Sequence, residues 1–336
     1  MTDLADRLAE AIAAGRAPDL HGVVAIHRGE RVLEHYGTGE DFSWGDSLGV
    51  VTFGSETLHD VRSVSKSVVG LLYGIALAGG LVPEPEESLL PQFPEYSDLA
   101  GDPKRARLTV EHALTMTLGL EWNEDLPYTS PDNSEIAMEF APDRYRYVLE
   151  RPIVEEPGTT WLYCGGATAL LAKLIAKGVG LPLEDFARER LFEPLGIDVF
   201  EWMRGADGEA SAASGLRLTP RDLARIGQTV LGDGDWEGRQ LVDEGWLRRA
   251  LRPHATMDEG FEYGYQWYVS FVDGPDGARH SWVGGIGNGG QRLHVVPDLH
   301  LVVAIMGGAY DAEDQWSMPE TVFADVVVGG IGEGSG

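Results

Sequence analysis

Cysteine, basic residues and long apolar runs are all scarce in this sequence. Cys164 is the single cysteine among 336 residues, so an intrachain disulfide is excluded. Lysine and arginine total 26 against 54 acidic residues, and the net charge of −28 disfavours nucleic acid and anionic membranes as partners. No apolar stretch is long enough to span a bilayer, and residues 1–7 lack the basic and apolar character of a signal peptide. The sequence therefore predicts a cytoplasmic protein that acts on a small molecule, and it carries no signal for an oligomeric state.

One of the few lysines gives the strongest functional signal. Only four lysines occur, and Lys66 is the one that has a serine, Ser63, three positions before it. Residues three apart lie on one helical face, so the amine can reach the hydroxyl. A partly desolvated lysine can lose its proton near neutral pH and act as the base that a serine nucleophile needs. The alternative is an ordinary helix start, in which Ser63 is the N-cap and Lys66 is solvated.

The segment after Ser63 predicts a buried helix. Its apolar residues cover most of the circumference, and Gly79-Gly80 ends it; they are Val64, Val68, Val69, Leu71, Leu72, Ile75, Ala76 and Leu77. A lysine near the first turn of such a helix needs a partner or a cleft, since lysine is almost never fully buried alone. We therefore expect Lys66 to face a cleft.

Strand patterns at both ends of the chain bracket a helical middle. The expected elements are a helix over 4–14, a hairpin of 23–27 with 31–36, strands at 265–271, 291–296 and 299–306, a second apolar helix over 168–176 and a closing helix over 319–328. These elements predict an α/β (α+β) unit with one antiparallel sheet flanked by helices. Residues 1–62 and 205–336 would form the sheet domain, and 63–204 a mainly helical subdomain.

Two other stretches offer groups for the same site. Tyr163 lies in the turn-rich stretch 157–166, where its phenol can relay protons if a cation lowers its pKa. Glycines around Asn288, including Gly287 and Gly289, lead into a strand and allow a ligand to approach backbone N–H groups closely. Such an N–H can complete an oxyanion hole. Alone, the tyrosine reads as a core residue and the glycines as a tight sheet corner.

Together these stretches resemble the class C β-lactamase-like serine hydrolases. That group includes penicillin-binding-type peptidases, family VIII carboxylesterases and 6-aminohexanoate-dimer hydrolases. The landmarks run in order through 58–67, 108–116, 157–163, 215–224, 264–267 and 289–297. The resemblance implies a β-lactamase/transpeptidase-like fold, Ser63 as acylated nucleophile, Lys66 as its base partner and Tyr163 as proton relay. It also implies an oxyanion hole from the N–H groups of Ser63 and Asn288, and no metal or organic cofactor.

Two departures from the family pattern bear on the substrate. Penicillin-recognising members carry Y-x-N, whereas this chain has Tyr163-Cys164-Gly165; they also carry K-T-G, where this chain has Gly285-Ile286-Gly287. The missing amide and the missing cation both disfavour β-lactams. We therefore expect hydrolysis of an ester or a non-peptide amide, with β-lactamase or peptidase activity, or a non-catalytic binding protein on the same fold, as alternatives.

The residues leave the proton route open. If Lys66 stays charged, it lowers the pKa of the phenol, and Tyr163 takes the serine proton. If Lys66 is neutral, it takes that proton itself, and Tyr163 delivers one to the leaving group.

Four weaker patterns are set aside. Residues 45–49 match both G-x-S-x-G and the opening of GDSL lipases, but no helix follows them. Residues 285–290 match a dinucleotide fingerprint, but a strand follows. Residues 233–244 nearly fit a calcium loop, and a solvated turn is the better interpretation. The histidines show no metal-binding spacing, and we expect His294 and His300 to be structural residues in adjacent strands.

Overall fold

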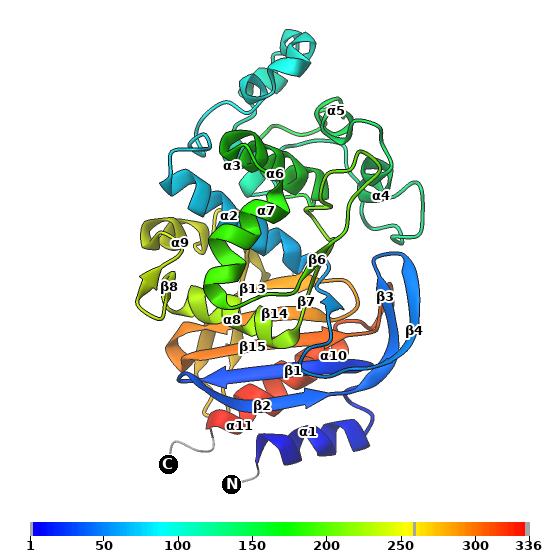
Figure 1. Cartoon of the computed structure of the whole chain (residues 1–336), viewed down its shortest axis with the longest axis vertical. Coiled ribbons are helices and arrows are strands. Elements are labelled where there is room, and N and C mark those ends of the chain that lie inside the picture. Colours follow the sequence, from blue (N-terminus) through cyan, green and yellow to red (C-terminus); the bar gives the residue numbers. More distant parts are fainter. Residues whose placement is uncertain (1–2, 258–259, 333–336) are drawn as a thin grey trace.

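The fold is organised around one antiparallel sheet, shown in a computed structural model that describes residues 3–257 and 260–332 (Figure 1). Within these residues, eight strands pair in the order β10-β11-β12-β13-β14-β15-β1-β2. The strands are β10 (Ala255–Thr256), β11 (Glu262–Tyr263), β12 (Tyr268–Asp273), β13 (Arg279–Gly287), β14 (Gln291–Val296), β15 (Leu301–Gly307), β1 (Leu20–His27) and β2 (Glu30–Tyr36). All neighbouring pairs are antiparallel, and both ends of the chain contribute, which confirms the predicted sheet.

Helices cover both faces of the sheet. On one face lie α1 (Leu4–Ala13) and the C-terminal run α10 (Ser317–Glu320), η8 (Thr321–Val328) and α11 (Gly329–Gly332), which bury Leu8 and Phe323 against the strands. On the other face lie α2 (Val64–Ala78) and α8 (Pro220–Leu231). The run Leu301–Gly307 is buried along its whole length because both faces are covered, as its continuous apolar sequence predicts.

The middle of the chain is mainly helical and lies beyond α2 (Figure 1). It contains α3 (Val110–Leu114), α4 (Ser134–Glu139), α5 (Arg144–Leu149), α6 (Gly165–Val179) and α7 (Leu183–Ala187). Two short sheets flank this part: β3 (Thr38–Ser43) with β4 (Asp46–Thr52), and β5 (His59–Asp60) with β7 (Leu216–Leu218) and β6 (Glu201–Trp202). The division at residues 62 and 205 stays a prediction.

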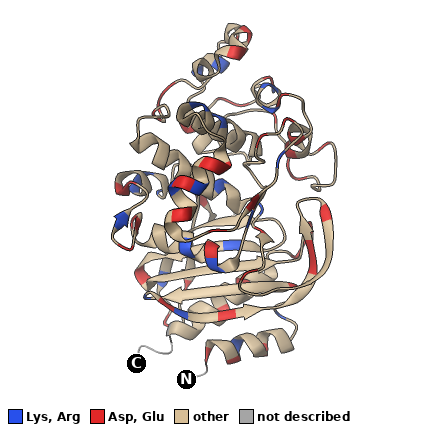
Figure 2. Cartoon of the chain, viewed as in Figure 1, with Lys and Arg blue, Asp and Glu red and all other residues tan. Residues whose placement is uncertain are grey.

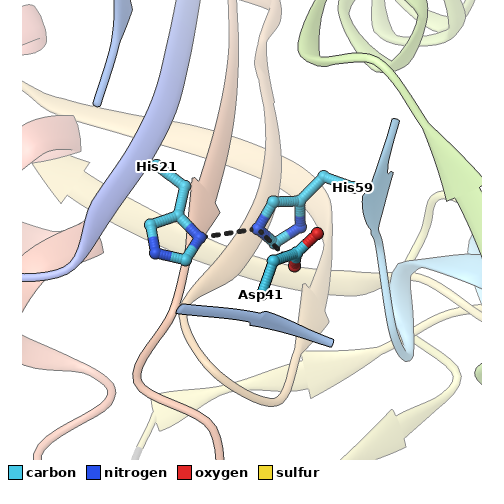
Figure 3. A group of neighbouring side chains, drawn as sticks. All are labelled: His21, Asp41 and His59. Carbon is cyan, nitrogen blue, oxygen red and sulfur yellow. Dashed lines mark hydrogen bonds and ion pairs between the residues drawn. The ribbon is translucent and has the colours of Figure 1, made fainter. Parts of the chain in front are cut away.

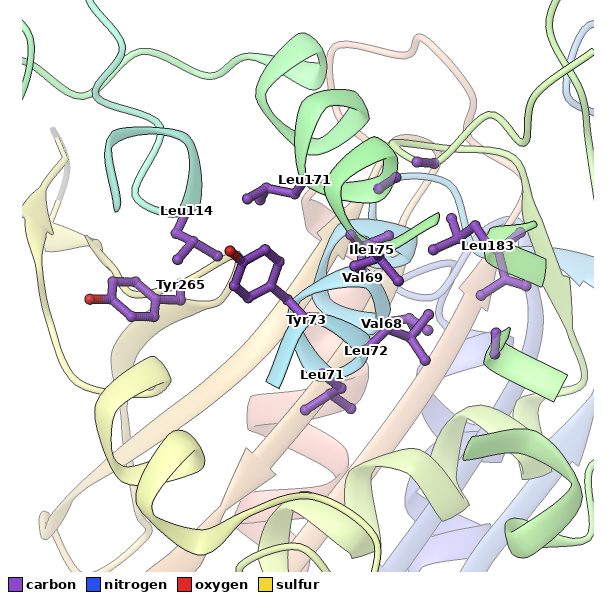
Figure 4. Close-up of a cluster of buried hydrophobic side chains, with 14 of the residues drawn as sticks. Val68, Val69, Leu71, Leu72, Tyr73, Leu114, Leu171, Ile175, Leu183 and Tyr265 are labelled. Atoms are coloured by element: carbon purple, nitrogen blue, oxygen red, sulfur yellow. The ribbon is translucent and has the colours of Figure 1, made fainter. Parts of the chain in front are cut away.

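Helix α2 runs through the centre of the hydrophobic core (Figure 4). Its residues from Val64 to Ala76 are all buried, as predicted. Gly74 lets α9 (Glu244–Ala250) approach closely, because a Cβ at this position would stand 2.1 Å from Cδ1 of Trp246. A glycine inside a helix costs about 1 kcal/mol relative to alanine, and here the packing of the indole requires it.

Two sequence predictions were imprecise, and one element was missed. Residues 265–267 precede β12, and Gln266 takes a left-handed backbone (φ 66°) so that its N–H can bond to the carbonyl of Leu114. His300 is not in a strand; it lies in the turn before β15 with φ 48°. The β3–β4 hairpin was not predicted, because its sequence mixes glycine and charged residues without a period of two.

Basic residues are interspersed among the acidic ones over the described part of the chain (Figure 2). Several of the buried arginines are paired: Arg144 contacts Glu139, and Arg217 contacts Asp41. Among residues 3–257 and 260–332, no single helix is long and apolar enough to cross a membrane; one bent pair, Gly165–Val179 with Leu183–Leu195, passes that test jointly.

Candidate active site

Ser63 and Lys66 meet at the start of α2. Lys66 Nζ lies 3.0 Å from Ser63 Oγ and 3.0 Å from the carbonyl oxygen of Ala213. The side chain of Lys66 is buried, and Ser63 is 8% exposed. Ser63 makes no side-chain capping bond to the helix. Ser63 is thus the N-cap residue of α2, as the alternative expected, but its hydroxyl faces the amine instead of a backbone N–H, and the expectation of a solvated Lys66 is wrong.

The backbone just before Ser63 is strained and held from several sides. Arg62 has φ 48°, a left-handed conformation that is uncommon for a residue with a Cβ. Its guanidinium donates to the carbonyl of Trp44 at 2.5 Å and pairs with Asp60 at 3.2 Å. The N–H of Trp44 also donates to Asp60 at 2.6 Å. The turn of the β3–β4 hairpin thus fixes the entry into the nucleophile helix.

Tyr163 covers the amine of Lys66. Lys66 Nζ lies 4.6 Å from the centre of the Tyr163 ring. Trp161 packs beside the Tyr163 ring at 6.2 Å between ring centres. The three residues that the sequence singled out, Ser63, Lys66 and Tyr163, therefore lie in one cluster.

The pKa of Tyr163 is raised, whereas one of the two expected proton routes requires Lys66 to lower it. Burial, and then the carboxylates of Glu124 and Glu135, raise the pKa of the phenol well above its usual value. The sequence did not reveal these carboxylates. With a raised pKa, Tyr163 is protonated at neutral pH and is suited to donate a proton rather than accept one.

A pair of carboxyl groups stands behind Lys66. Glu135 Oε2 lies 3.5 Å from Lys66 Nζ, and Glu135 is completely buried. Burial alone would raise the pKa of Glu135, but the ammonium of Lys66 and hydrogen bonds from Glu124 and Ser214 hold it below the usual value. Burial and the charge of Glu135 raise the pKa of Glu124 to about 8. At neutral pH, Glu124 is therefore the protonated member of the pair and Glu135 the ionised one.

Gly165, the third residue of the Y-x-N-like stretch, makes room for this pair. A Cβ at Gly165 would stand 2.5 Å from Glu135 Oε2 and 3.1 Å from Glu124 Oε1. The N–H of Gly165 donates to Glu124 Oε1 at 2.6 Å. A side chain at position 165, where the Y-x-N motif has its asparagine, would thus meet the carboxylate of Glu135, which comes from another part of the chain.

The glycine stretch lies beside the nucleophile on the sheet. Gly287 ends β13, and a Cβ there would stand 3.1 Å from the Cβ of Arg62. The side chain of Asn288 donates to Asp311 at 2.7 Å. The N–H of Gly289 donates to Gln315 Oε1 at 2.8 Å, so this group is already engaged. The role of Asn288 in an oxyanion hole stays a prediction.

A second buried polar group lies near the residues that lead into Ser63. It consists of His21, Asp41 and His59 (Figure 3). Each offers one ligand atom, all within 4.8 Å of one another, which is a spacing that suits a metal ion. Hydrogen bonds already account for the two rings. His59 Nδ1 lies 2.9 Å from the carbonyl of Asp60 and must donate to it, so its Nε2 accepts from His21 Nδ1 at 2.9 Å.

Electrostatics also favour a structural role for this histidine group. Burial lowers the pKa of His59 to about 4, so its ring is neutral at neutral pH. Asp41 is already paired with the guanidinium of Arg217 at 3.2 Å, and Arg217 binds Asp60 as well at 2.7 Å. The group therefore ties β1, β3 and β5 together and positions the residues that lead into Ser63.

The other set-aside patterns have ordinary explanations. Ser47 lies within β4, which excludes a nucleophile elbow. Residues 285–290 lead from β13 into β14, without a helix. Asp235 and Gly238 belong to a tight hairpin in which the N–H of Gly238 bonds to the Asp235 carboxylate. His294 is buried and stacks on Phe323 with 3.8 Å between ring centres, a structural position.

No pattern in the sequence indicates a functional role for Glu124, Glu135, Ser214 or Trp44. With 54 acidic residues in the chain, no pattern distinguishes the two carboxyls that fold inward. The one local signal is Asn133, whose side chain caps α4 and accepts from the N–H of Glu135 at 3.0 Å. This cap determines where α4 begins, but it does not indicate which group the carboxylate of Glu135 contacts.

Comparison with known proteins agrees with this geometry. A family model described as Beta-lactamase matches residues 5–310. The chain belongs to this family. It is 26% identical to the 6-aminohexanoate-dimer hydrolase of Paenarthrobacter ureafaciens, over 92% of this chain and 78% of that protein. The family and this relative confirm the expected class, a serine hydrolase related to β-lactamases.

Solved structures confirm the fold. EstCE1, a hydrolase with promiscuous acyltransferase activity, superposes with a TM-score of 0.73 at 15% identity, covering 97% of this chain and 99% of that one. The octameric penicillin-binding protein homologue from Pyrococcus abyssi gives 0.70 at 17% identity, covering 95% and 74%. The β-lactamase/transpeptidase-like architecture predicted from the sequence is therefore correct.

Proposed function

We propose that this protein hydrolyses a small-molecule ester or non-peptide amide through an acyl-enzyme on Ser63. The observation that carries the proposal is the 3.0 Å contact between Lys66 Nζ and Ser63 Oγ. A serine hydroxyl becomes a useful nucleophile only when a neighbouring group takes its proton. Tyr163, whose ring centre lies 4.6 Å from the same amine, supplies a second proton-transfer partner.

The reaction follows from these positions in two halves. Ser63 Oγ attacks the substrate carbonyl while its proton passes to Lys66, and the N–H groups of Ser63 and Asn288 stabilise the oxyanion. Each such donor is commonly worth roughly 3–4 kcal/mol. Tyr163 delivers a proton to the leaving group, which departs to give the acyl-enzyme, and Lys66 passes the proton it took from Ser63 on to Tyr163. Water then attacks the ester carbonyl and gives a proton to Lys66, and this proton returns to Ser63 Oγ as the ester bond breaks.

The substrate class rests on what the site contains where β-lactam-binding groups would stand. Gly165 provides no side-chain amide, and residues 285–287 provide no cation for a substrate carboxylate. Two relatives are named as a 6-aminohexanoate-dimer hydrolase and a lovastatin esterase. Both features support an ester or non-peptide amide.

A labelling and turnover experiment tests the proposal. Wild type should react with a fluorophosphonate probe at Ser63 and hydrolyse members of a panel of p-nitrophenyl esters and short amide oligomers, with slow nitrocefin turnover. Ser63→Ala should abolish labelling and turnover. The matched control is Ser67→Ala, which removes a hydroxyl from the same helix that bonds to Gln266 instead; it should keep both.

Two results would count against the proposal. Folded wild type that neither labels nor turns over any ester or amide would point to a binding protein. Nitrocefin hydrolysis faster than any ester or amide would contradict the substrate class.

A further inference from the structure

The contacts of Lys66 raise a question about its proton. The described acceptors around Lys66 Nζ are Ser63 Oγ at 3.0 Å, the carbonyl of Ala213 at 3.0 Å and Glu135 Oε2 at 3.5 Å. An ammonium has three N–H donors and no lone pair, and these three acceptors match it. In this state Lys66 cannot take the proton of Ser63 until it has given one up.

Only one of these three acceptors can take a proton from Lys66. The carbonyl of Ala213 is not basic, and the hydroxyl of Ser63 is the group that must lose its own proton. The carboxylate of Glu135 remains. From this we propose that Glu135 is a positioning residue for Lys66, which accepts a proton from the ammonium so that the amine can deprotonate Ser63; the inference rests on the proposed function.

The transfer balances within the site. A proton moves from Lys66 Nζ to Glu135 Oε2, and the Oγ–H proton of Ser63 moves to the freed lone pair of Lys66 as Oγ bonds to the substrate carbon. The first transfer neutralises an ammonium and a carboxylate together. Since the pair is buried, converting two opposite charges into two neutral groups changes no net charge and removes their desolvation cost.

Six titratable or polar groups face Glu135 from the elements packed around it. They are Lys66 on α2, Glu124 and Tyr128 on the loop before α4, Tyr163 before α6, Ser214 before β7, and Glu139 one turn later on α4. The hydroxyl of Ser214 donates to Glu135 Oε1, and the indole N–H of Trp44 in turn donates to Ser214 at 3.1 Å. This chain of donors fixes one carboxylate oxygen and leaves Oε2 for Lys66.

Glu124 sets the charge that Glu135 carries. Because burial and Glu135 raise the pKa of Glu124 to about 8, Glu124 is mostly protonated at neutral pH. Glu135 then holds a single negative charge that faces Lys66. Gly165 is part of the same arrangement, since any side chain there would collide with Glu135 Oε2.

The test is the pH dependence of Glu135→Gln, which keeps the size of the side chain but cannot accept a proton. We expect kcat for a p-nitrophenyl ester to fall about 100-fold at pH 7 with little change in KM. In this variant the proton of Lys66 must leave for water, so activity should climb steadily from pH 7 to 10. Wild type should be flat over much of that range.

The matched control is Glu139→Gln, the same substitution one helical turn along α4, at a buried carboxyl that binds Arg144 instead. It should keep the shape of the wild-type pH profile. Glu135→Asp retains a carboxylate at a greater distance, so it should show a lower kcat with the wild-type shape. If Glu135→Gln does not fold, the pH profile of Glu135→Asp is the test instead.

The outcomes separate this inference from the proposed function. Wild type that is not labelled at Ser63 and shows no turnover overturns the proposed function. Labelled, active wild type with Glu135→Gln at the wild-type rate, or reduced by a factor that does not change with pH, overturns this inference alone. So does a Glu135→Asp profile that climbs with pH.

Discussion

Two buried clusters of a cation and carboxylates meet on the short helix α4, one turn apart. In the first, Glu135 faces Lys66; in the second, Glu139 faces Arg144. Lys66 and Arg144 are both almost completely buried. Arg144 binds Asp207 with two nitrogens and also donates to the carbonyls of Glu209 and Ala210.

The difference between the clusters is the proton. A guanidinium does not give up its charge in a protein, so the Arg144 cluster is confined to holding loop 205–210 against α4 and α5. An ammonium can be deprotonated, and the Lys66 cluster places a hydroxyl, a phenol and a carboxylate around it. We therefore expect the same kind of ion pair to serve stability in one place and, under the proposed function, proton transfer in the other.

Exchanging the cation in the first cluster should have the largest effect. Lys66→Arg keeps the positive charge beside Glu135 but removes a group that can act as base. We expect kcat/KM for p-nitrophenyl esters to fall about 10³-fold with the fold retained. Fluorophosphonate labelling and circular dichroism measure the two effects separately. Activity within a few fold of wild type would mean that Lys66 acts only as a fixed charge.

The reciprocal exchange tests the second cluster. Arg144→Lys cannot reproduce the planar set of donors that reaches Asp207, Glu139 and two carbonyls. Buried acceptors left unsatisfied should lower the free energy of unfolding by about 2–3 kcal/mol. Urea denaturation measures the loss, and kcat per folded molecule should stay near that of wild type. A large drop in kcat without loss of stability would contradict the separation of the two clusters.

Tyr163→Phe sharpens the description of the Lys66 cluster. Because the pKa of the phenol is raised, we expect Tyr163 to act as a donor to the leaving group, and amines need that proton more than activated phenolates do. We expect kcat/KM for an amide to fall roughly 10-fold further than kcat/KM for a matched p-nitrophenyl ester. Steady-state kinetics on both substrates decide this. Equal losses would place the phenol in the attack of Ser63 itself.

How far the sequence could predict these two clusters depends on distance along the chain. Ser63 and Lys66 are three residues apart on one helix, so their contact follows from helical geometry. Lys66 and Glu135 are 69 positions apart, and nothing local links them. The alternating pattern of residues 265–271, which includes most of β12, and the continuous apolar run of β15 predicted the sheet. The β3–β4 hairpin, which holds Arg62 through Trp44, has no such pattern.

The pair of buried carboxyls in the Lys66 cluster should also make the free energy of unfolding depend on pH. This effect should be smaller than the effects predicted above. The pKa of Glu124 is raised from an ordinary value of 4.5 to about 8, so the folded protein retains a proton that the unfolded chain releases above about pH 4.5. This contribution favours folding at low pH and is lost as pH rises towards 8.

Glu124→Gln has no proton to release at this position. Between pH 5 and 8, the free energy of unfolding should fall less in the variant than in wild type, by on the order of 1–2 kcal/mol. Urea denaturation at pH 5, 6, 7 and 8 measures both slopes. Parallel slopes for the two proteins would mean that Glu124 is ionised in the folded state. Glu135 would then face a second negative charge, and the assignment of one proton to this carboxyl pair would be wrong.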